Sequence, residues 1–119
     1  GVDLIVAGAP VLGFSLPTDA MVRSLSKEAI KPDLSNPSMR DWLDSLPTGH
    51  GRSAAFETRI WWSPGGATKA IQRVLEEVGY PAIADAQRFI VKDRYGPLKE
   101  GELERAKQWG AELARAMAD

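Results

Sequence analysis

The sequence contains no cysteine and only one histidine, His50. The absence of cysteine excludes disulfides, thiolate catalysis, iron–sulfur clusters and cysteine-ligated zinc, and one histidine cannot build a histidine metal site. We therefore expect no metal site and no catalytic residue of these kinds, so redox chemistry would need a bound cofactor. His50 stands in "PTGHGR", where a solvated turn residue is a better interpretation than a catalytic one.

Long apolar runs and an excess of positive charge are also missing. No apolar run approaches the ~20 residues that a membrane helix needs, and no basic segment followed by an apolar one opens the sequence. The 15 basic and 16 acidic residues leave a net charge of −1, with no basic stripe to follow a phosphate backbone or an anionic membrane. We expect a soluble, cytoplasmic protein that binds neither nucleic acid nor a membrane.

The residues that are present suit one compact core. The chain has 119 residues, of which 44% are hydrophobic and 26% charged. This length is too short for two ordinary domains. We therefore expect residues 1–119 to form a single domain.

Three apolar runs predict strands over residues 2–8, 53–57 and 82–92. The first, "VDLIVAG", is apolar almost throughout, which is typical of a strand buried on both faces in a parallel sheet. Segments with helical periodicity separate the runs. Strands that alternate with helices favour right-handed crossovers, so we expect an α/β fold with a doubly wound parallel sheet and helices on both faces.

The best-defined helix is predicted from Ser63 to Gly79. Ser63 is a natural N-cap, Pro64 suits the first helical position, and Gly79 ends the apolar repeat. The stretch "SPGGATK" does not have the spacing of a phosphate-binding loop. Helix capping is therefore its better explanation.

Further helices are predicted at the C-terminus and in the first crossover. The C-terminal helix should span 99–117, with Gly110 allowing close approach to the sheet and Leu103 facing inward. Two helical pieces, 17–26 and 36–46, should form the first crossover, the second capped by Asn36.

The charged residues near these elements have ordinary interpretations. Glu100, Glu102 and Glu104 fall in the first turn of the C-terminal helix, where the helix dipole favours negative charge. We interpret them as a solvated helix start rather than a paired-carboxylate site. Arg59 and Arg94 suit either an anionic ligand or the surface.

Three stretches of the chain resemble the flavodoxin-like family of FMN-binding electron carriers and their quinone-reductase relatives. They are "DLIVAGAPVLGFSLP", "SAAFETR" with the loop "IWWSPGGATKAIQRVLEEVGY", and "FIVKDRYGPLKEGELERAKQWGAELA". The match runs from about residue 2 to the end. It implies that loops after the first two strands of this chain enclose the isoalloxazine ring of FMN, at the edge where open parallel sheets bind ligands.

The same resemblance implies the residues that contact the cofactor. Without it, the adjacent Trp61 and Trp62 would more readily be interpreted as packing residues; with it, they become a loop that stacks on the ring. The residues that correspond by motif are Pro10, Val11, Leu12, Gly13 and Phe14 on one side of the flavin, and Thr58, Arg59, Ile60, Trp61, Trp62 and Gly65 on the other.

The sequence departs from the family at its beginning. Members begin with a strand and a Ser/Thr-rich loop that holds the FMN phosphate, and nothing like it precedes residue 2. We therefore expect either that the chain is the remainder of a longer protein or that a truncated form exists. The strand at 2–8 would then have one unpaired side, through which we expect a homo-oligomer to form unless the missing segment covers it.

Three functions remain open on this evidence. The leading one is an FMN-dependent redox protein that transfers electrons to a protein partner. The second is an NAD(P)H-dependent or quinone-type reductase on the same scaffold. The third is a cofactor-free interaction domain that has kept the fold and lost the site.

Overall fold

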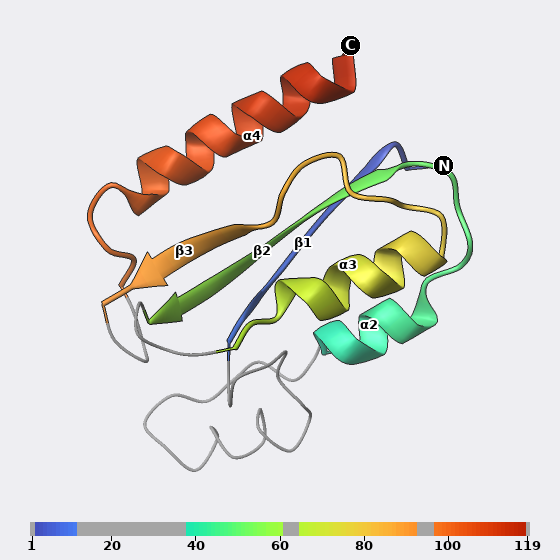
Figure 1. Cartoon of the computed structure of the whole chain (residues 1–119), viewed down its shortest axis with the longest axis horizontal. Helices are drawn as coiled ribbons and strands as arrows, with labels where there is room; N and C mark the ends of the chain where they lie inside the picture. Colours follow the sequence, from blue (N-terminus) through green and yellow to red (C-terminus); the bar gives the residue numbers. More distant parts are fainter. Residues whose placement is uncertain (1, 12–37, 61–64, 93–96, 119) are drawn as a thin grey trace.

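The computed structural model describes residues 2–11, 38–60, 65–92 and 97–118, which form three strands and three helices (Figure 1). In chain order these elements are β1 (Leu4–Pro10), α2 (Met39–Ser45), β2 (Arg52–Ile60), α3 (Thr68–Glu77), β3 (Gln87–Val91) and α4 (Glu102–Ala118).

The strands form one parallel sheet in the order β1-β2-β3. Leu4 lies opposite Arg52, and Phe56 lies opposite Gln87. The α/β class and the three strands in chain order are therefore confirmed. The third strand is shorter than the predicted 82–92, because after an isolated bridge between Ser53 and Ala82 the chain leaves the ladder until Gln87.

Helices cover both faces of the sheet, as the sequence predicted. Helices α2 and α3 lie on one face and α4 lies on the other (Figure 1). The larger core lies under α2 and α3, where Ile71 and Leu75 are fully buried against alanines of β1 and β2. The smaller core lies under α4 and is built around Phe89, Trp109 and Leu113.

The predicted helix starts are wrong by several residues. Gly65 and Gly66 are not helical and α3 begins at Thr68, because its first amides bond to a side chain from β2 that is described below. Ser63 and Pro64, the expected start, lie outside the described residues. Helix α4 begins at Glu102 rather than 99, since Gly101 has a φ of +84°, which an α-helix does not accommodate.

The N-cap of α2 also differs from the prediction. Ser38, not Asn36, precedes the helix, and its Oγ accepts a hydrogen bond of 3.1 Å from the Asp41 N–H. Leu43 is buried in the larger core. Asn36 and the predicted helix at 17–26 lie outside the described residues.

Two expectations for α4 are wrong. A Cβ atom added at Gly110 would meet no atom within 4 Å, so this glycine does not serve close packing on the sheet. Leu103 is 66% exposed and does not face inward. Helix α4 therefore reaches the sheet mainly through Trp109 and Leu113. Within the described residues, no helix has the length and apolar character needed to cross a membrane.

Candidate functional site

The carboxyl ends of β1 and β2 lie side by side. Pro10 is opposite Thr58 in the parallel register, and the Val11 N–H donates a hydrogen bond of 3.0 Å to the Thr58 carbonyl oxygen. Pro10 is exposed, whereas Val11, Thr58 and Ile60 are half-buried. The structure therefore brings together the starts of both segments that the sequence assigned to the cofactor.

The remaining residues of that assignment are only partly covered by the structure. Gly65 is exposed and has a φ of +80°. The residues of the assignment that lie outside the described part of the chain are Leu12, Gly13, Phe14, Trp61 and Trp62; Arg94, a possible anion contact, lies outside it too.

Arg59 is buried rather than on the surface. Its side chain is 7% exposed and its Nη1 lies 2.8 Å from Oε2 of Glu57, which is 1% exposed. The same nitrogen donates a hydrogen bond of 2.6 Å to the Gly65 carbonyl oxygen. Nη1 of the guanidinium group is thus engaged inside the protein by a carboxylate and a carbonyl oxygen, which holds the Arg59 side chain on the α3 side of the strand.

The other oxygen of Glu57 caps helix α3. Glu57 Oε1 accepts hydrogen bonds from the backbone N–H groups of Ala67 at 2.9 Å and Thr68 at 3.3 Å. Helix N-termini next to parallel strands are common anion sites because their first N–H groups are free and their dipole is positive. Here an internal carboxylate occupies that position, so an anionic ligand finds those two donors already used.

Successive residues of β2 face opposite sides of the sheet. Glu57 and Arg59 point to the side of α3. Phe56 and Thr58 point to the side of α4, where they line the apolar groove described next. The side chains of Thr58 and Arg59 therefore lie on opposite faces of the sheet. A flat ligand at the strand end cannot have both of these side chains on one of its surfaces.

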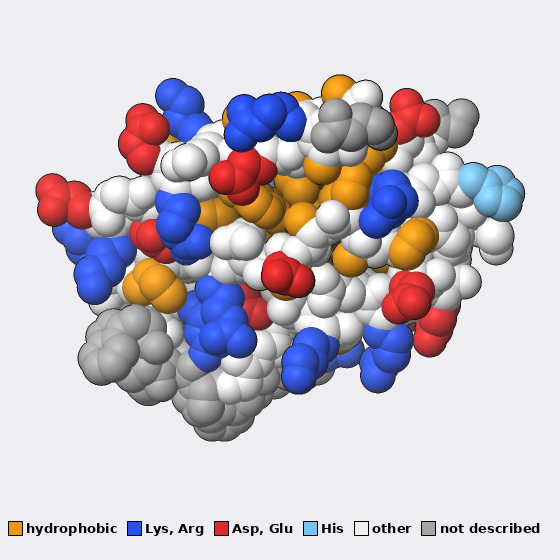
Figure 2. Space-filling view, turned by 45° about the horizontal axis from the view of Figure 1, so that its top comes forward, with side chains coloured by type: hydrophobic (Ala, Val, Ile, Leu, Met, Phe, Trp, Pro, Cys, Tyr) orange, Lys and Arg blue, Asp and Glu red, His pale blue; other side chains and the backbone are white. Residues whose placement is uncertain are grey.

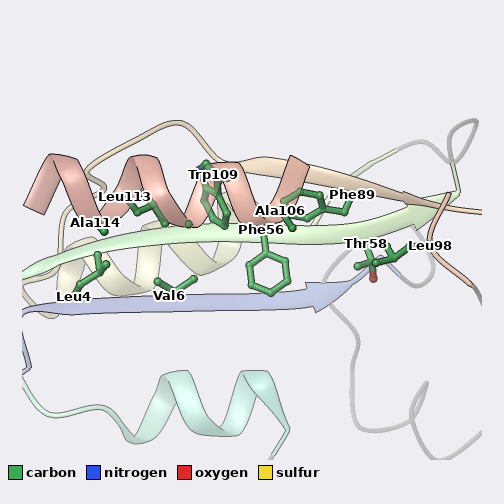
Figure 3. A pocket seen from close by; sticks show the side chains of 11 residues that line it. Leu4, Val6, Phe56, Thr58, Phe89, Leu98, Ala106, Trp109, Leu113 and Ala114 are labelled. Carbon is green, nitrogen blue, oxygen red and sulfur yellow. The ribbon is translucent and has the colours of Figure 1, made fainter. Parts of the chain in front are cut away.

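A second feature of the sheet is an apolar groove between α4 and the strands. Its volume is about 450 Å³. Figure 3 shows Leu4 and Ala114 at one end and Thr58 and Leu98 at the other. Hydrophobic side chains gather in the middle of this face, with charged side chains around them (Figure 2). The complete lining is Leu4, Val6, Phe56, Thr58, Phe89, Leu98, Ala106, Trp109, Gly110, Leu113 and Ala114.

Three aromatic rings form the inner wall of the groove. Phe56 lies 5.9 Å from Phe89 and 6.0 Å from Trp109 between ring centroids, in edge-to-face geometry. The guanidinium of Arg105 lies 4.6 Å from the Phe89 centroid. Within the described residues, the buried Nε1 of Trp109 has no hydrogen-bond partner. The groove thus offers aromatic and aliphatic contacts with very little polar recognition.

Glu102 is not merely a solvated residue at a helix start. Its Oε2 accepts a hydrogen bond of 2.6 Å from the Ile90 N–H and lies 2.9 Å from Nη2 of Arg105. Arg105 lowers the pKa of the Glu102 carboxyl, helped by the Ile90 N–H and opposed by partial burial. Glu102 in turn raises the pKa of Arg105. The pair ties α4 to β3.

Sequence reasoning missed Glu57 and Glu102 as structural residues. The available signal for Glu57 was a carboxylate inside the apolar run "SAAFET", which requires a buried partner. For Glu102 the signal was Arg105 three residues later on the same helix face. His50 is exposed, as predicted. Across the described ranges, no group of three or more His, Asp or Glu side chains is placed to hold a metal ion.

Comparison of the chain with protein-family models, with curated proteins and with solved structures found no match. The resemblance to flavodoxin-like proteins therefore stays a prediction from the quoted motifs, and the fold class rests on the parallel sheet itself.

Proposed function

We propose that the chain is a flavodoxin-type redox protein that holds the ring of FMN at the carboxyl edge of β1 and β2 and passes electrons to a protein partner. The observation that carries this proposal is the hydrogen bond between Val11 and Thr58, which joins the two segments assigned to the ring. Open parallel sheets bind ligands at this edge. The flavin would supply the redox chemistry.

The residues at this edge fit an uncharged, flat group better than an anionic one. Pro10 and Ile60 supply apolar surface, and Val11 and Thr58 bring backbone close to it. Arg59, the cation in this segment, is neutralised by Glu57. With no free cation from the described residues of this segment, the edge would disfavour the anionic reduced ring and lower the flavin's reduction potential.

Titration of FMN with the purified chain, followed by quenching of flavin fluorescence, tests the proposal. Pro10→Asp places a charge at the edge and should weaken FMN binding at least about tenfold, equivalent to 1.4 kcal/mol. Val2→Asp is the matched control, because Val2 is also exposed and lies before the opposite end of the same strand. No quenching by the wild-type chain, or equal loss in both variants, would contradict the proposal.

A cofactor-free interaction domain is the second candidate, and the apolar groove beside α4 favours it. Val6, in the wall of the groove, is 47% exposed although it is aliphatic. Exposed apolar patches mark protein–protein interaction sites or ligand-binding grooves, and this groove has very little polar recognition for a ligand. An absorption scan and the same titration separate the two candidates, because an interaction domain neither carries nor binds flavin.

A further inference from the structure

The outer edge of β3 is covered by the chain itself. The Ile90 N–H donates to Glu102, the Lys99 N–H donates to the Ile90 carbonyl at 2.8 Å, and the Lys92 N–H donates to the Pro97 carbonyl at 2.9 Å. Arg105 also donates to the Arg88 carbonyl. Helix α4 and the segment before it therefore bond to both outward polar groups of Ile90 and to the outward carbonyl of Arg88.

The outer edge of β1 has no such cover from any described residue. The Asp3 carbonyl and the Val11 N–H both form hydrogen bonds with β2. In a parallel ladder every second residue bonds to the same neighbouring strand, so the odd-numbered residues between them also bond to β2. The N–H and C=O groups of Leu4, Val6 and Gly8 consequently point outward in the plane of the sheet, on the side of β1 that faces away from β2. Pro10, the next in this series, has no N–H.

Of the usual protections against pairing, this edge carries only a proline, Pro10, at the end of the strand. Exposed edge strands are commonly shielded by lysine, by proline, by inward charges or by a bulge. Within β1 there is no charged residue, and its register with β2 runs without interruption from Leu4 to Pro10. Val2 and Val6 are about half exposed. No described residue therefore blocks this edge between Leu4 and Gly8, and the edge is apolar where another strand would meet it.

We propose that β1 pairs with β1 of a second copy of this chain, antiparallel and about a two-fold axis at Val6. Val6 then lies opposite Val6 of the other copy, and each donates one hydrogen bond to the other and accepts one. Leu4 of each copy pairs in the same way with Gly8 of the other. The two sheets become one continuous sheet.

The pattern of outward groups allows a second copy to pair with this edge. Leu4, Val6 and Gly8 are spaced evenly about Val6, so the edge is complementary to itself after a two-fold rotation, as an isologous interface requires. Asp3 falls opposite Ala9 of the other copy, so no like charges meet. Pro10 ends the ladder at the same place in both copies.

Side chains on the α4 face are what favours a second copy as the occupant of this edge. The Phe56 ring lies over Gly8 so closely that a Cβ atom there would overlap it. Leu4 of one copy, placed opposite Gly8 of the other, therefore meets the Phe56 ring of that copy. The half-exposed Val6 side chains of both copies cover each other, which removes apolar surface from water.

The size of the contact sets the expected strength. A seven-residue strand is about 23 Å long, and pairing along it buries less than the ~800 Å² per partner of a standard stable interface. We therefore expect a dissociation constant on the order of micromolar or weaker. Dimerisation should be visible as a concentration-dependent mass rising from 12.9 kDa toward twice that value.

Sedimentation velocity of the 119-residue chain from about 1 μM upward, toward ~1 mM, spans this range of affinities and tests the proposal. Val6→Lys puts two like charges opposite each other at the axis and should raise the dissociation constant more than about tenfold. Leu103→Lys is the matched control, because Leu103 is the more exposed leucine on α4 and lies away from this edge. Circular dichroism checks that both variants fold.

A mixing experiment tests the register itself. Val6→Lys and Val6→Glu should each be mainly monomeric, and an equimolar mixture should associate at least as tightly as the wild type, since opposite charges then meet at the axis. A wild-type chain that stays monomeric at ~1 mM, a Val6→Lys chain that dimerises normally, or a mixture that stays monomeric would each overturn the proposal. Pairing of this edge with a foreign peptide strand in place of a second copy would also overturn the proposal.

Discussion

Glu57 and Arg59 form a buried ion pair from positions two apart on one strand, with Nη1 and Oε2 2.8 Å apart. Both residues face α3 because side chains alternate along β2. Through this pair the strand holds the Gly65 carbonyl and the first amides of α3. The chain leaving β2 is therefore fixed to the strand again only a few residues later.

Replacement of Glu57 by glutamine should lower the free energy of unfolding by about 3–5 kcal/mol, the usual cost of leaving one member of a buried pair uncompensated. Glutamine can keep one acceptor oxygen for the α3 amides but then turns its NH2 group toward Arg59, so the change removes both the charge and the acceptor of the ion pair. Urea unfolding measures the effect. Glu112→Gln, at an exposed position of α4, is the control and should change stability by less than about 0.5 kcal/mol.

The double variant Glu57→Gln/Arg59→Met separates charge from packing. Removing the unpaired guanidinium should recover part of the loss, because a neutral pair of similar size needs no charge compensation. A loss of less than about 1 kcal/mol in the free energy of unfolding for Glu57→Gln alone would show that solvent reaches Arg59 and that the pair is not buried.

Gly79→Ala should destabilise the protein more than Gly101→Ala. Both glycines have positive φ, +102° and +84°, so both substitutions carry a similar backbone cost of about 1–2 kcal/mol. A Cβ atom at Gly79 would also overlap the backbone carbonyl of Gly49, whereas one at Gly101 would meet nothing within 4 Å. We expect an additional loss of at least about 1 kcal/mol for Gly79→Ala in thermal or urea unfolding. Equal losses of stability would show that the backbone at Gly49 can move away from Gly79 at little cost.

The sheet could be predicted from the sequence because its signal is local and repeated. Continuous apolar runs such as residues 2–8 indicate buried parallel strands, and the helical segments between them require crossovers. Strand order and class followed from these patterns alone. The end of α3 was also local, since Gly79 adopts a positive φ just beyond it.

The helix starts and the site could not be predicted in the same way, because they depend on contacts between distant residues. The first amides of α3 bond to Glu57, ten residues before Ala67, and this contact overrides the local preference for Ser63. Glu102 was assigned to solvent because the sequence does not show that the Ile90 N–H lies beside it. The groove likewise depends on how far α4 lies across the sheet.

The link between Glu102 and Arg105 should make stability fall in acid. Arg105 and the Ile90 N–H lower the pKa of Glu102 below its ordinary value of 4.5, so the folded state favours the ionised carboxylate. This contribution is complete above pH 4.5 and is lost as the pH falls through the lowered pKa. Glu102→Gln should therefore cost about 1 kcal/mol at pH 7, since Arg105 is partly exposed, and the difference should shrink as the pH falls below 4.5 toward the lowered pKa.

Chemical unfolding of wild type and variant at several pH values measures this difference. Glu104→Gln is the matched control, because Glu104 occupies the same first turn and is exposed. It shares the helix dipole but not the contact with Ile90. A pH-independent difference for Glu102→Gln would show that its carboxylate acts through packing rather than charge.

Riboflavin should bind this chain nearly as well as FMN. The N–H groups of Ala67 and Thr68, which would otherwise suit a phosphate, are already bonded to Glu57. Arg59 is paired with the same carboxylate, so it offers no charge to a phosphate either. We expect the two dissociation constants to agree within about threefold, a difference of roughly 0.6 kcal/mol. Parallel fluorescence titrations at low and high salt measure the ratio. FMN binding more than about tenfold tighter, and weakening as salt rises, would mean that residues outside the described ranges supply a phosphate site.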